Sequence, residues 1–151
     1  MPEKTLFLKK NSALTNCRAV QNTQKLETKP KILVVEDNFL NQKIAQIFLE
    51  DMGYQVDIAE NGSQALQMFN QEYSGILMDI GLPDMDGCDV CSSIRKLDYG
   101  KDIPIIALTA SGDFFKDKCL AAGMNSYLTK PIINEDLKNE LYQFIPIEAE
   151  C

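Results

Sequence analysis

The chain has 151 residues, a formal net charge of −7, 45% hydrophobic residues and no histidine. The length suits one domain with a single buried core. Residues 1–29 carry six of the 15 Lys and Arg but two of the 22 acids, so the rest of the chain is strongly acidic, which argues against nucleic acid as its partner. The absence of histidine excludes Ser/His/Asp and Cys/His nucleophilic sites.

The beginning of the chain differs from the rest. Residues 1–29 are polar and show no period that would bury one face, which predicts a flexible leader or linker. From Lys31 onward, short apolar runs alternate with segments of helical period, as is typical of a parallel sheet covered by helices. We therefore predict a leader over residues 1–29, one folded domain over 30–146 and a short tail over 147–151.

The first half of the folded part contains three predicted strands, at residues 32–35, 54–59 and 75–79. A helix capped by Asn38 and ended by Gly53 separates the first two strands. Its apolar stripe consists of Leu40, Ile44, Ile47 and Phe48. A second helix opens at Asn61, and its inner face consists of Ala65, Leu66 and Phe69.

The second half contains two predicted strands, at residues 105–109 and 126–129, and three predicted helices. The apolar residues of the helix after Gly87 are Val90, Cys91, Ile94 and Leu97. Those of a helix from Asp113 to the stop at Gly123 are Phe114, Phe115, Cys119 and Leu120. The last helix, from about Asn134, is expected to bury Leu137, Leu141 and Phe144. Five strands alternating with five helices predict a doubly wound α/β fold.

The cysteines and the hydropathy of the sequence indicate where in the cell the protein is located. The five cysteines are scattered through the chain, at Cys17, Cys88, Cys91, Cys119 and Cys151. Their odd number and spacing predict a reduced, cytoplasmic protein. Cys88 and Cys91 have metal-ligand spacing, but without a second pair or a histidine we interpret them as helix cysteines without chemistry. No run approaches the roughly 20 apolar residues of a membrane span, so we expect no membrane contact.

Polar residues stand where the predicted strands end. Glu36 and Asp37 follow the first strand, Asp79 ends the third, Thr109 ends the fourth and Lys130 follows the fifth. The carboxyl ends of parallel strands meet at one edge of a sheet, where ligands of such folds bind. These five residues are therefore predicted to share one site.

The chemistry expected of this site is phosphoryl transfer. A cluster of carboxylates suits Mg²⁺, held by Asp37, Asp79 and the backbone carbonyl of Gly81. An aspartate can itself accept the phosphoryl group as an acyl phosphate, while Lys130 and Thr109 offer an ammonium and a hydroxyl to its oxygens. The bland alternative treats each residue as an ordinary turn residue, but their common position at strand ends favours a site.

The segments that carry these residues resemble those of a response-regulator receiver domain of two-component signalling. The matching segments are residues 32–38, 78–87, 105–110 and 130–131. The resemblance implies a flavodoxin-like (βα)5 fold whose five-stranded parallel sheet has the order 2-1-3-4-5. It also implies a cis peptide bond between Lys130 and Pro131.

The resemblance assigns a role to each residue of the site. It makes Asp79 the phosphoacceptor and places Mg²⁺ on Asp79, Asp37, the Gly81 carbonyl and Glu36, the last reaching the metal through water. The remaining roles are the switch hydroxyl of Thr109, the phosphate-binding backbone of Ala110, the phosphate-pairing ammonium of Lys130 and the switch aromatic ring of Tyr127. The alternative for Tyr127 is a half-buried strand tyrosine at the sheet edge.

The same resemblance implies partners. The phosphoryl donor would be a phosphohistidine on a histidine kinase or histidine phosphotransfer protein, and the phosphorylated chain could pair with a second copy. The chain would promote only its own phosphorylation and dephosphorylation, unless it is a fragment of a hybrid histidine kinase. Residues 36–38 followed by Asn41 and Gln42 look most like the receivers attached to such hybrid kinases.

Three other functions compete with this interpretation. A receiver fold could serve as a binding scaffold without phosphotransfer. A Mg²⁺-dependent phosphatase of the haloacid-dehalogenase type also forms an aspartyl phosphate, but it normally needs a second acid two positions later, where this chain has Gly81. A flavin-binding module would need Ser, Thr and Gly after the first strand, where Glu36 and Asp37 would repel phosphate.

Overall fold

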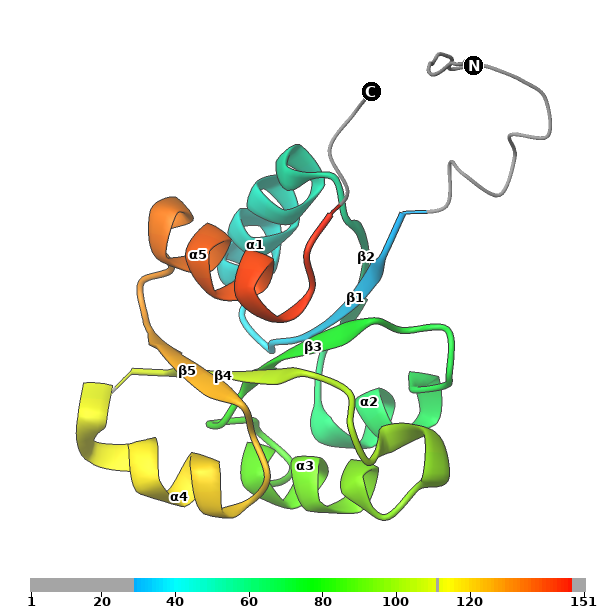
Figure 1. Ribbon diagram of the computed structural model, residues 1–151. Helices are drawn as coiled ribbons and strands as arrows, with labels where there is room; N and C mark the ends of the chain where they lie inside the picture. Colours follow the sequence, from blue (N-terminus) through cyan, green and yellow to red (C-terminus); the bar gives the residue numbers. More distant parts are fainter. Residues whose placement is uncertain (1–28, 111, 148–151) are drawn as a thin grey trace, which may run out of the picture. The chain divides into compact units, whose positions relative to one another are not determined.

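The structure is a computed structural model that describes residues 29–110 and 112–147. The predicted leader, apart from Lys29, and the predicted tail, apart from Ile147, lie outside the described residues. Pro30–Pro146 form one compact unit, built around a five-stranded parallel sheet of order β2-β1-β3-β4-β5 (Figure 1). The predicted flavodoxin-like fold and its strand order are confirmed.

The elements alternate along the chain. The strands are β1 Lys31–Val35, β2 Gln55–Ala59, β3 Gly75–Asp79, β4 Ile105–Thr109 and β5 Ser126–Thr129. The α-helices are α1 Phe39–Met52, α2 Gly62–Met68, α3 Gly87–Arg95, α4 Lys116–Ala121 and α5 Asn134–Phe144. Two short 3₁₀ helices, η3 Asp98–Gly100 and η4 Gly112–Phe115, precede β4 and α4. No helix in the described ranges is long and apolar enough to cross a bilayer.

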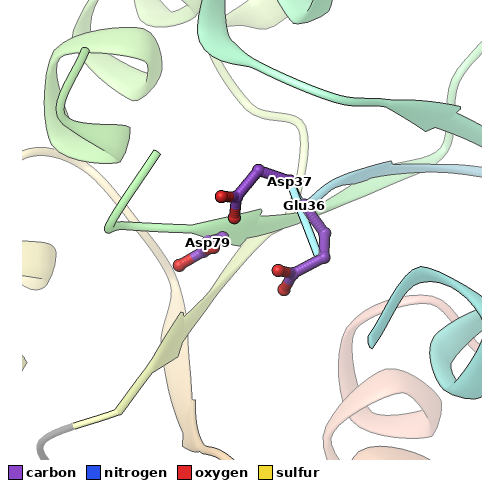
Figure 2. A group of neighbouring side chains, drawn as sticks. All are labelled: Glu36, Asp37 and Asp79. Carbon is purple, nitrogen blue, oxygen red and sulfur yellow. The ribbon is translucent and has the colours of Figure 1, made fainter. Parts of the chain in front are cut away.

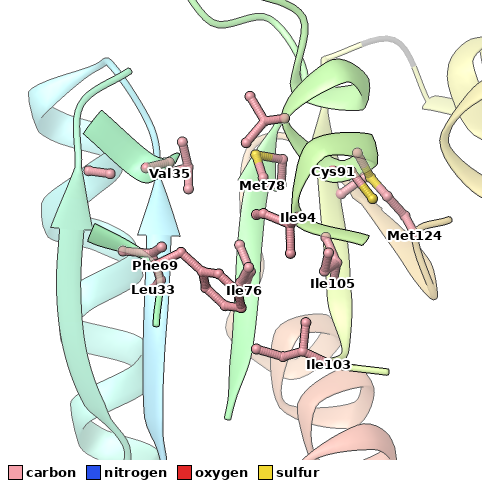
Figure 3. Close-up of a cluster of buried hydrophobic side chains, with 14 of the residues drawn as sticks. Leu33, Val35, Phe69, Ile76, Met78, Cys91, Ile94, Ile103, Ile105 and Met124 are labelled. Atoms are coloured by element: carbon pink, nitrogen blue, oxygen red, sulfur yellow. The ribbon is translucent and has the colours of Figure 1, made fainter. Parts of the chain in front are cut away.

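Burial explains the composition of the strands. All five residues of β3 and of β4 are buried, because helices cover both faces of the sheet. Figure 1 shows α1 and α5 on one face and α2, α3 and α4 on the other. The edge strands β2 and β5 are partly exposed, as the alternating sequence of β2 had suggested. Side chains on the α2 to α4 face form a continuous cluster that includes Leu33, Val35, Ile76, Met78, Ile94 and Ile105 (Figure 3).

Helix α1 confirms the predicted ends but corrects the predicted face. Asn38 caps its start, and Gly53 ends it with φ of 107°, a left-handed conformation that glycine adopts without strain. Its buried residues are Gln42, Ala45 and Leu49. The predicted stripe was wrong, because Leu40 is 65% exposed and Ile47 is 62% exposed, whereas Ile44 and Phe48 are half-buried. The helix is apolar on more than one side, so composition alone did not reveal which side faces the sheet.

Two later helices also differ from expectation. The segment after β4 begins as the 3₁₀ helix η4 and becomes α-helical at Lys116. Phe114 is 80% exposed and Leu120 41%, so only Cys119 of the predicted face is fully buried. In α5, Phe144 is half-buried and the neighbouring Ile145 takes the core position. Each of these helices contributes only a few side chains to the core, and its other apolar residues remain partly or fully exposed.

The predicted position of Cys88 and Cys91 in a helix is confirmed. Cys88 and Cys91 lie in α3 and Cys119 lies in α4, and all three are free and buried. Two effects raise the pKa of Cys88 to about 12: burial, which is the larger, and the repulsion of the nearby Asp86 carboxylate. Such thiols stay protonated at neutral pH and are poor ligands and nucleophiles.

The loop after β3 is tightly folded. Gly81 and Asp86 form an antiparallel bridge, and the Gly87 N–H donates to the Ile80 carbonyl at 3.1 Å. A Cβ atom on Gly87 would lie 2.5 Å from the Asp79 carbonyl oxygen and 2.7 Å from the Ile80 Cα. Glycine therefore lets α3 begin directly against the end of β3, which keeps the loop close to Asp79.

We expect Gly87→Ala to destabilise the protein by roughly 1–3 kcal/mol, because the new methyl group would press on main-chain atoms. Alanine is the better helix former, so propensity alone predicts the opposite sign. The measurement is urea unfolding followed by circular dichroism. Gly81→Ala is the control, since the nearest atom to its Cβ is the Asp79 Oδ1 at 3.8 Å. Equal unfolding midpoints for the two variants would refute the steric account.

Candidate functional site

The strand order brings the predicted site residues to one edge of the sheet. β1 and β3 are neighbours, so Glu36 and Asp37 after β1 lie beside Asp79 at the end of β3. One potential ligand oxygen from each of the three carboxylates lies within 4.8 Å of the others (Figure 2). Among the residues that the structure describes, this is the one group of three His, Cys, Asp or Glu side chains close enough to hold a metal ion.

Lys130 brings a positive charge to the cluster. Its Nζ lies 3.0 Å from Glu36 Oε1 and 3.1 Å from Asp79 Oδ2. Its main-chain N–H donates to the Thr109 carbonyl at 2.8 Å, which ties the end of β5 to the end of β4. The peptide bond to Pro131 is cis, as predicted. The sequence indicated a pairing with a phosphoryl group, whereas in this structure the ammonium lies between two carboxylates.

Burial and charge shift the pKa values of this cluster. Burial raises the pKa of Glu36, the nearby Lys130 ammonium partly offsets this effect, and the Asp79 charge raises the pKa further. Burial alone would lower the pKa of Lys130, but the contacts with Glu36 and Asp79 outweigh it and raise the pKa. Lys130 therefore stays protonated, and one ammonium faces two of three carboxylates.

The two oxygens of Glu36 have different surroundings. Oε2 accepts hydrogen bonds from the Asn38 N–H at 3.1 Å and from Asn41 Nδ2 at 3.5 Å. Oε1 is buried and lies 3.0 Å from the Lys130 ammonium, which it shares with Asp79. The excess of carboxylates over ammonium groups fits a hard divalent cation such as Mg²⁺.

Asp79 is held by its own loop. Its carboxylate is 6% exposed, and Oδ1 accepts a hydrogen bond from the Gly81 N–H at 2.9 Å while Oδ2 faces Lys130. Gly81 lies where the chain turns back toward Asp86. The hydrogen bond from the Gly81 N–H keeps Gly81, whose carbonyl is a predicted metal ligand, in the same turn as the Asp79 carboxylate.

The remaining predicted residues lie along β4 and β5. Asp79 pairs in register with Leu108, so Thr109 is one residue beyond it at the sheet edge, where it is buried. Ala110 follows and is exposed. Tyr127 lies in β5, half-buried, and the Lys116 Nζ of α4 lies 5.6 Å from the centre of its ring. Tyr127 is therefore in contact with α4.

Two acids that sequence reasoning passed over fix the loop after Asp79. Asp84 accepts hydrogen bonds from the N–H groups of Gly62 and Ser63 at 2.8 and 2.9 Å, and these bonds, that of Ser63 first, lower its pKa. Asp86 caps α3 through the Cys88 N–H at 2.8 Å and accepts from Lys118 Nζ at 2.6 Å. An acid just before a helix start is a recognisable capping signal for Asp86, but the pairing of Asp84 with α2 has no local signal.

Comparison with known proteins gives a consistent set of relatives. Residues 32–142 match the family described as the response regulator receiver domain. The chain is 39% identical over 141 residues to hybrid signal transduction histidine kinase B of Dictyostelium discoideum, a match that covers 85% of this chain. That match is 7% of the length of the Dictyostelium kinase, so the chain corresponds to a small part of it.

Solved structures resemble the same unit. The receiver domain of a sensor histidine kinase from Pseudomonas aeruginosa PAO1, with a magnesium ion coordinated in its active-site cleft, has a TM-score of 0.72 and 39% identity over 80% of this chain and 100% of that one. A Saccharomyces cerevisiae complex of a histidine phosphotransfer protein with the receiver domain of its downstream response regulator has a TM-score of 0.70 and 32% identity, covering 77% of this chain and 88% of that one.

We expect Glu36→Gln to stabilise the metal-free protein increasingly as pH rises above 4.5, the ordinary pKa of this group. Because the folded-state pKa of Glu36 is raised, the folded protein holds this proton to higher pH than the unfolded chain, and ionisation at higher pH lowers the free energy of unfolding. Urea unfolding in EDTA from about pH 5 to about pH 8 measures the difference.

The matched control for this prediction is Glu50→Gln on the exposed side of α1, which keeps the acceptor for the Gln46 side chain. The gain in stability with rising pH expected of Glu36→Gln should exceed that of this control. A Glu36→Gln variant that is no more stable than wild type at about pH 8 would contradict the proposed burial of an unfavourable charge.

Proposed function

This chain belongs to the response regulator receiver domain family of two-component signalling, and on that premise we propose that Asp79 accepts a phosphoryl group from a phosphohistidine. One observation carries the proposal. The buried carboxylate of Asp79 lies beside an acidic pair, with oxygen atoms of the three carboxylates within 4.8 Å of one another, and one ammonium contacts both Asp79 and Glu36. A structural salt bridge would need one carboxylate for one ammonium, and this cluster has two carboxylates in excess.

The metal expected here is Mg²⁺. We propose that Asp37, Asp79 and the Gly81 carbonyl bind it, with Glu36 acting through water. When bound, Mg²⁺ offsets the negative charge of the carboxylates and coordinates phosphoryl oxygens. The magnesium ion in the cleft of the P. aeruginosa receiver supports the choice of Mg²⁺ as the metal. Without a cation, three carboxylates would repel a phosphoryl donor from the site.

The chain's own residues do the rest. An Asp79 carboxylate oxygen attacks phosphorus, an O–P bond forms as the P–N bond of the phosphohistidine breaks, and the electron pair of that bond returns to the imidazole nitrogen. Lys130, which in this structure lies 3.1 Å from Asp79 Oδ2, then pairs with a phosphoryl oxygen. The Thr109 hydroxyl and the Ala110 N–H donate to the others.

The donor has to come from outside these residues, because the chain has no histidine. We propose a histidine kinase or a histidine phosphotransfer protein, and the yeast complex of a receiver with a phosphotransfer protein supports the second. Exposed apolar side chains flank the site as such docking requires: Phe39, 69% exposed, follows Asp37 by two residues, and Ile133, 56% exposed, follows Lys130 by three. Self-phosphorylation and hydrolysis of the acyl phosphate are the reactions we assign to the chain.

We further propose that phosphorylation changes the surface formed by α4, β5 and α5, on which a second copy or another partner could bind. Phosphorylated Asp79 would draw the Thr109 hydroxyl inward and vacate space for the Tyr127 ring. The contact between that ring and Lys116 supports the proposal, because movement of Tyr127 would be felt at the first residue of α4.

Incubation with phosphoramidate and Mg²⁺ should add one phosphoryl mass to the wild-type chain and none to Asp79→Ala, measured by intact-protein mass spectrometry. The addition should require Mg²⁺ and disappear with EDTA. Asp98→Ala is the control, since the Asp98 side chain is 97% exposed and away from the sheet edge. An unmodified wild type would instead favour a binding scaffold, and phosphate release from a generic monoester would favour a phosphatase.

In Tyr127→Ala, Asp79 should still be phosphorylated, but phosphorylation should no longer affect α4 and α5. The measurement is hydrogen–deuterium exchange of these helices with and without beryllofluoride, a mimic of the phosphoryl group. Wild type should show a change in exchange that the variant lacks, whereas Tyr99→Ala, on η3 against Phe69, should behave as wild type. Identical responses in wild type and Tyr127→Ala would reject the switch role of Tyr127.

A further inference from the structure

A fourth buried polar side chain accompanies the site. Among the described residues, four polar or charged residues are buried: Glu36, Gln42, Asp79 and Thr109. Three of them belong to the proposed site, and the fourth, Gln42, is 8% exposed and lies in α1. Burying an amide is unfavourable unless it makes hydrogen bonds, so the partner of Gln42 indicates what the residue does.

The partner is the main chain of Glu36. Gln42 Nε2 donates to the Glu36 carbonyl at 2.7 Å, in a buried position. The Glu36 N–H donates in turn to the Ala59 carbonyl at 3.0 Å, at the end of β2. Both main-chain groups of Glu36 are therefore held, one by the sheet and the other by the Gln42 side chain.

This carbonyl belongs to the peptide group that joins Glu36 to Asp37. A hydrogen bond to it restricts the plane of that peptide, and the plane sets the direction in which the chain enters Asp37. Asp37 is exposed, so surrounding packing does little to orient it. The orientation of the Asp37 carboxylate toward Asp79 thus depends on a group that Gln42 holds.

The first turn of α1 holds the carboxylate of Glu36 as well. The Asn38 N–H and Asn41 Nδ2 both donate to Glu36 Oε2. Asn38 also caps the helix by accepting from the Asn41 N–H at 2.9 Å, and its carbonyl accepts from the Gln42 N–H at 2.9 Å. Side-chain and main-chain contacts with Glu36 therefore come from the same rigid helical turn.

We propose that Gln42 is a positioning residue for Mg²⁺ binding, which fixes the Glu36–Asp37 peptide so that both acids face Asp79. The inference rests on the proposed function, because it concerns the same metal site. Residues that orient metal ligands from outside the ligand set typically change metal affinity about 10- to 100-fold when they are replaced. Gln42 does not touch the reacting atoms, so its loss should weaken Mg²⁺ binding rather than the chemistry at full occupancy.

The test compares two identical substitutions one helical turn apart. Gln42→Met keeps the length of the side chain and removes the donor. Gln46→Met makes the same change where the amide bonds the Glu50 side chain at 3.1 Å on the exposed side of α1. The Mg²⁺ dissociation constant is measured by calorimetry without any phosphoryl donor, and thermal unfolding of each variant is recorded beside it.

Gln42→Met should weaken Mg²⁺ binding at least about 10-fold, and Gln46→Met should stay within about twofold of wild type. At saturating Mg²⁺, the rate of phosphorylation by phosphoramidate should return to about the wild-type value in both variants. An unchanged dissociation constant in Gln42→Met, with or without a lower unfolding temperature, overturns the inference. A wild type that binds no Mg²⁺ overturns the proposed function itself, so the two failures are distinguishable.

A measurement on the wild type keeps the inference testable if Gln42→Met does not fold. The side-chain amide proton signals of Gln42 in the NMR spectrum should shift during the Mg²⁺ titration, with the midpoint given by calorimetry. The corresponding signals of Gln46 serve as the internal control and should not move. Gln42 signals that stay unchanged while Mg²⁺ binds would overturn the positioning role.

Discussion

Electrostatic repulsion among three carboxylates at the sheet edge is the interaction on which the rest of this structure depends. Oxygen atoms of Glu36, Asp37 and Asp79 lie within 4.8 Å of one another, and Lys130 faces two of these residues. Burial of Glu36 raises its pKa, and the nearby Asp79 charge raises it further. Such a cluster reduces the stability of the metal-free protein and at the same time creates the affinity for a cation and a phosphoryl group that we propose as its function.

Holding like charges together requires a rigid frame, and the main chain supplies most of it. The carboxylate of Asp79 is bound by the Gly81 N–H, and that of Glu36 by the Asn38 N–H. The loop after β3 is fastened by Asp84 to α2, and Gly87 lets α3 start against β3. These hydrogen bonds hold the carboxylates of Asp79 and Glu36 in place beside each other.

Helix α4 contacts both the loop that follows Asp79 and the strand β5. Lys118 binds Asp86 at the end of the loop that follows Asp79, and Lys116 lies over the ring of Tyr127 in β5. A rearrangement at Asp79 can therefore reach α4 from the loop and from the neighbouring strand. Two contacts on one short helix support the proposed switch, because a helix with few buried residues has little packing to resist movement.

Local patterns in the sequence determined the alternation of strands and helices, the Asn38 cap, the Gly53 stop and the placement of site residues at strand ends, because each depends on neighbouring residues alone. The resemblance to a known family added the strand order. Only the tertiary structure decided which side of α1 is buried, because the exposed Leu40 and Ile47 are at least as apolar as the buried Gln42, Ala45 and Leu49. It also decided the contacts of Gln42 with Glu36 and of Asp84 with α2, because these partners meet only when the sheet and its helices have assembled.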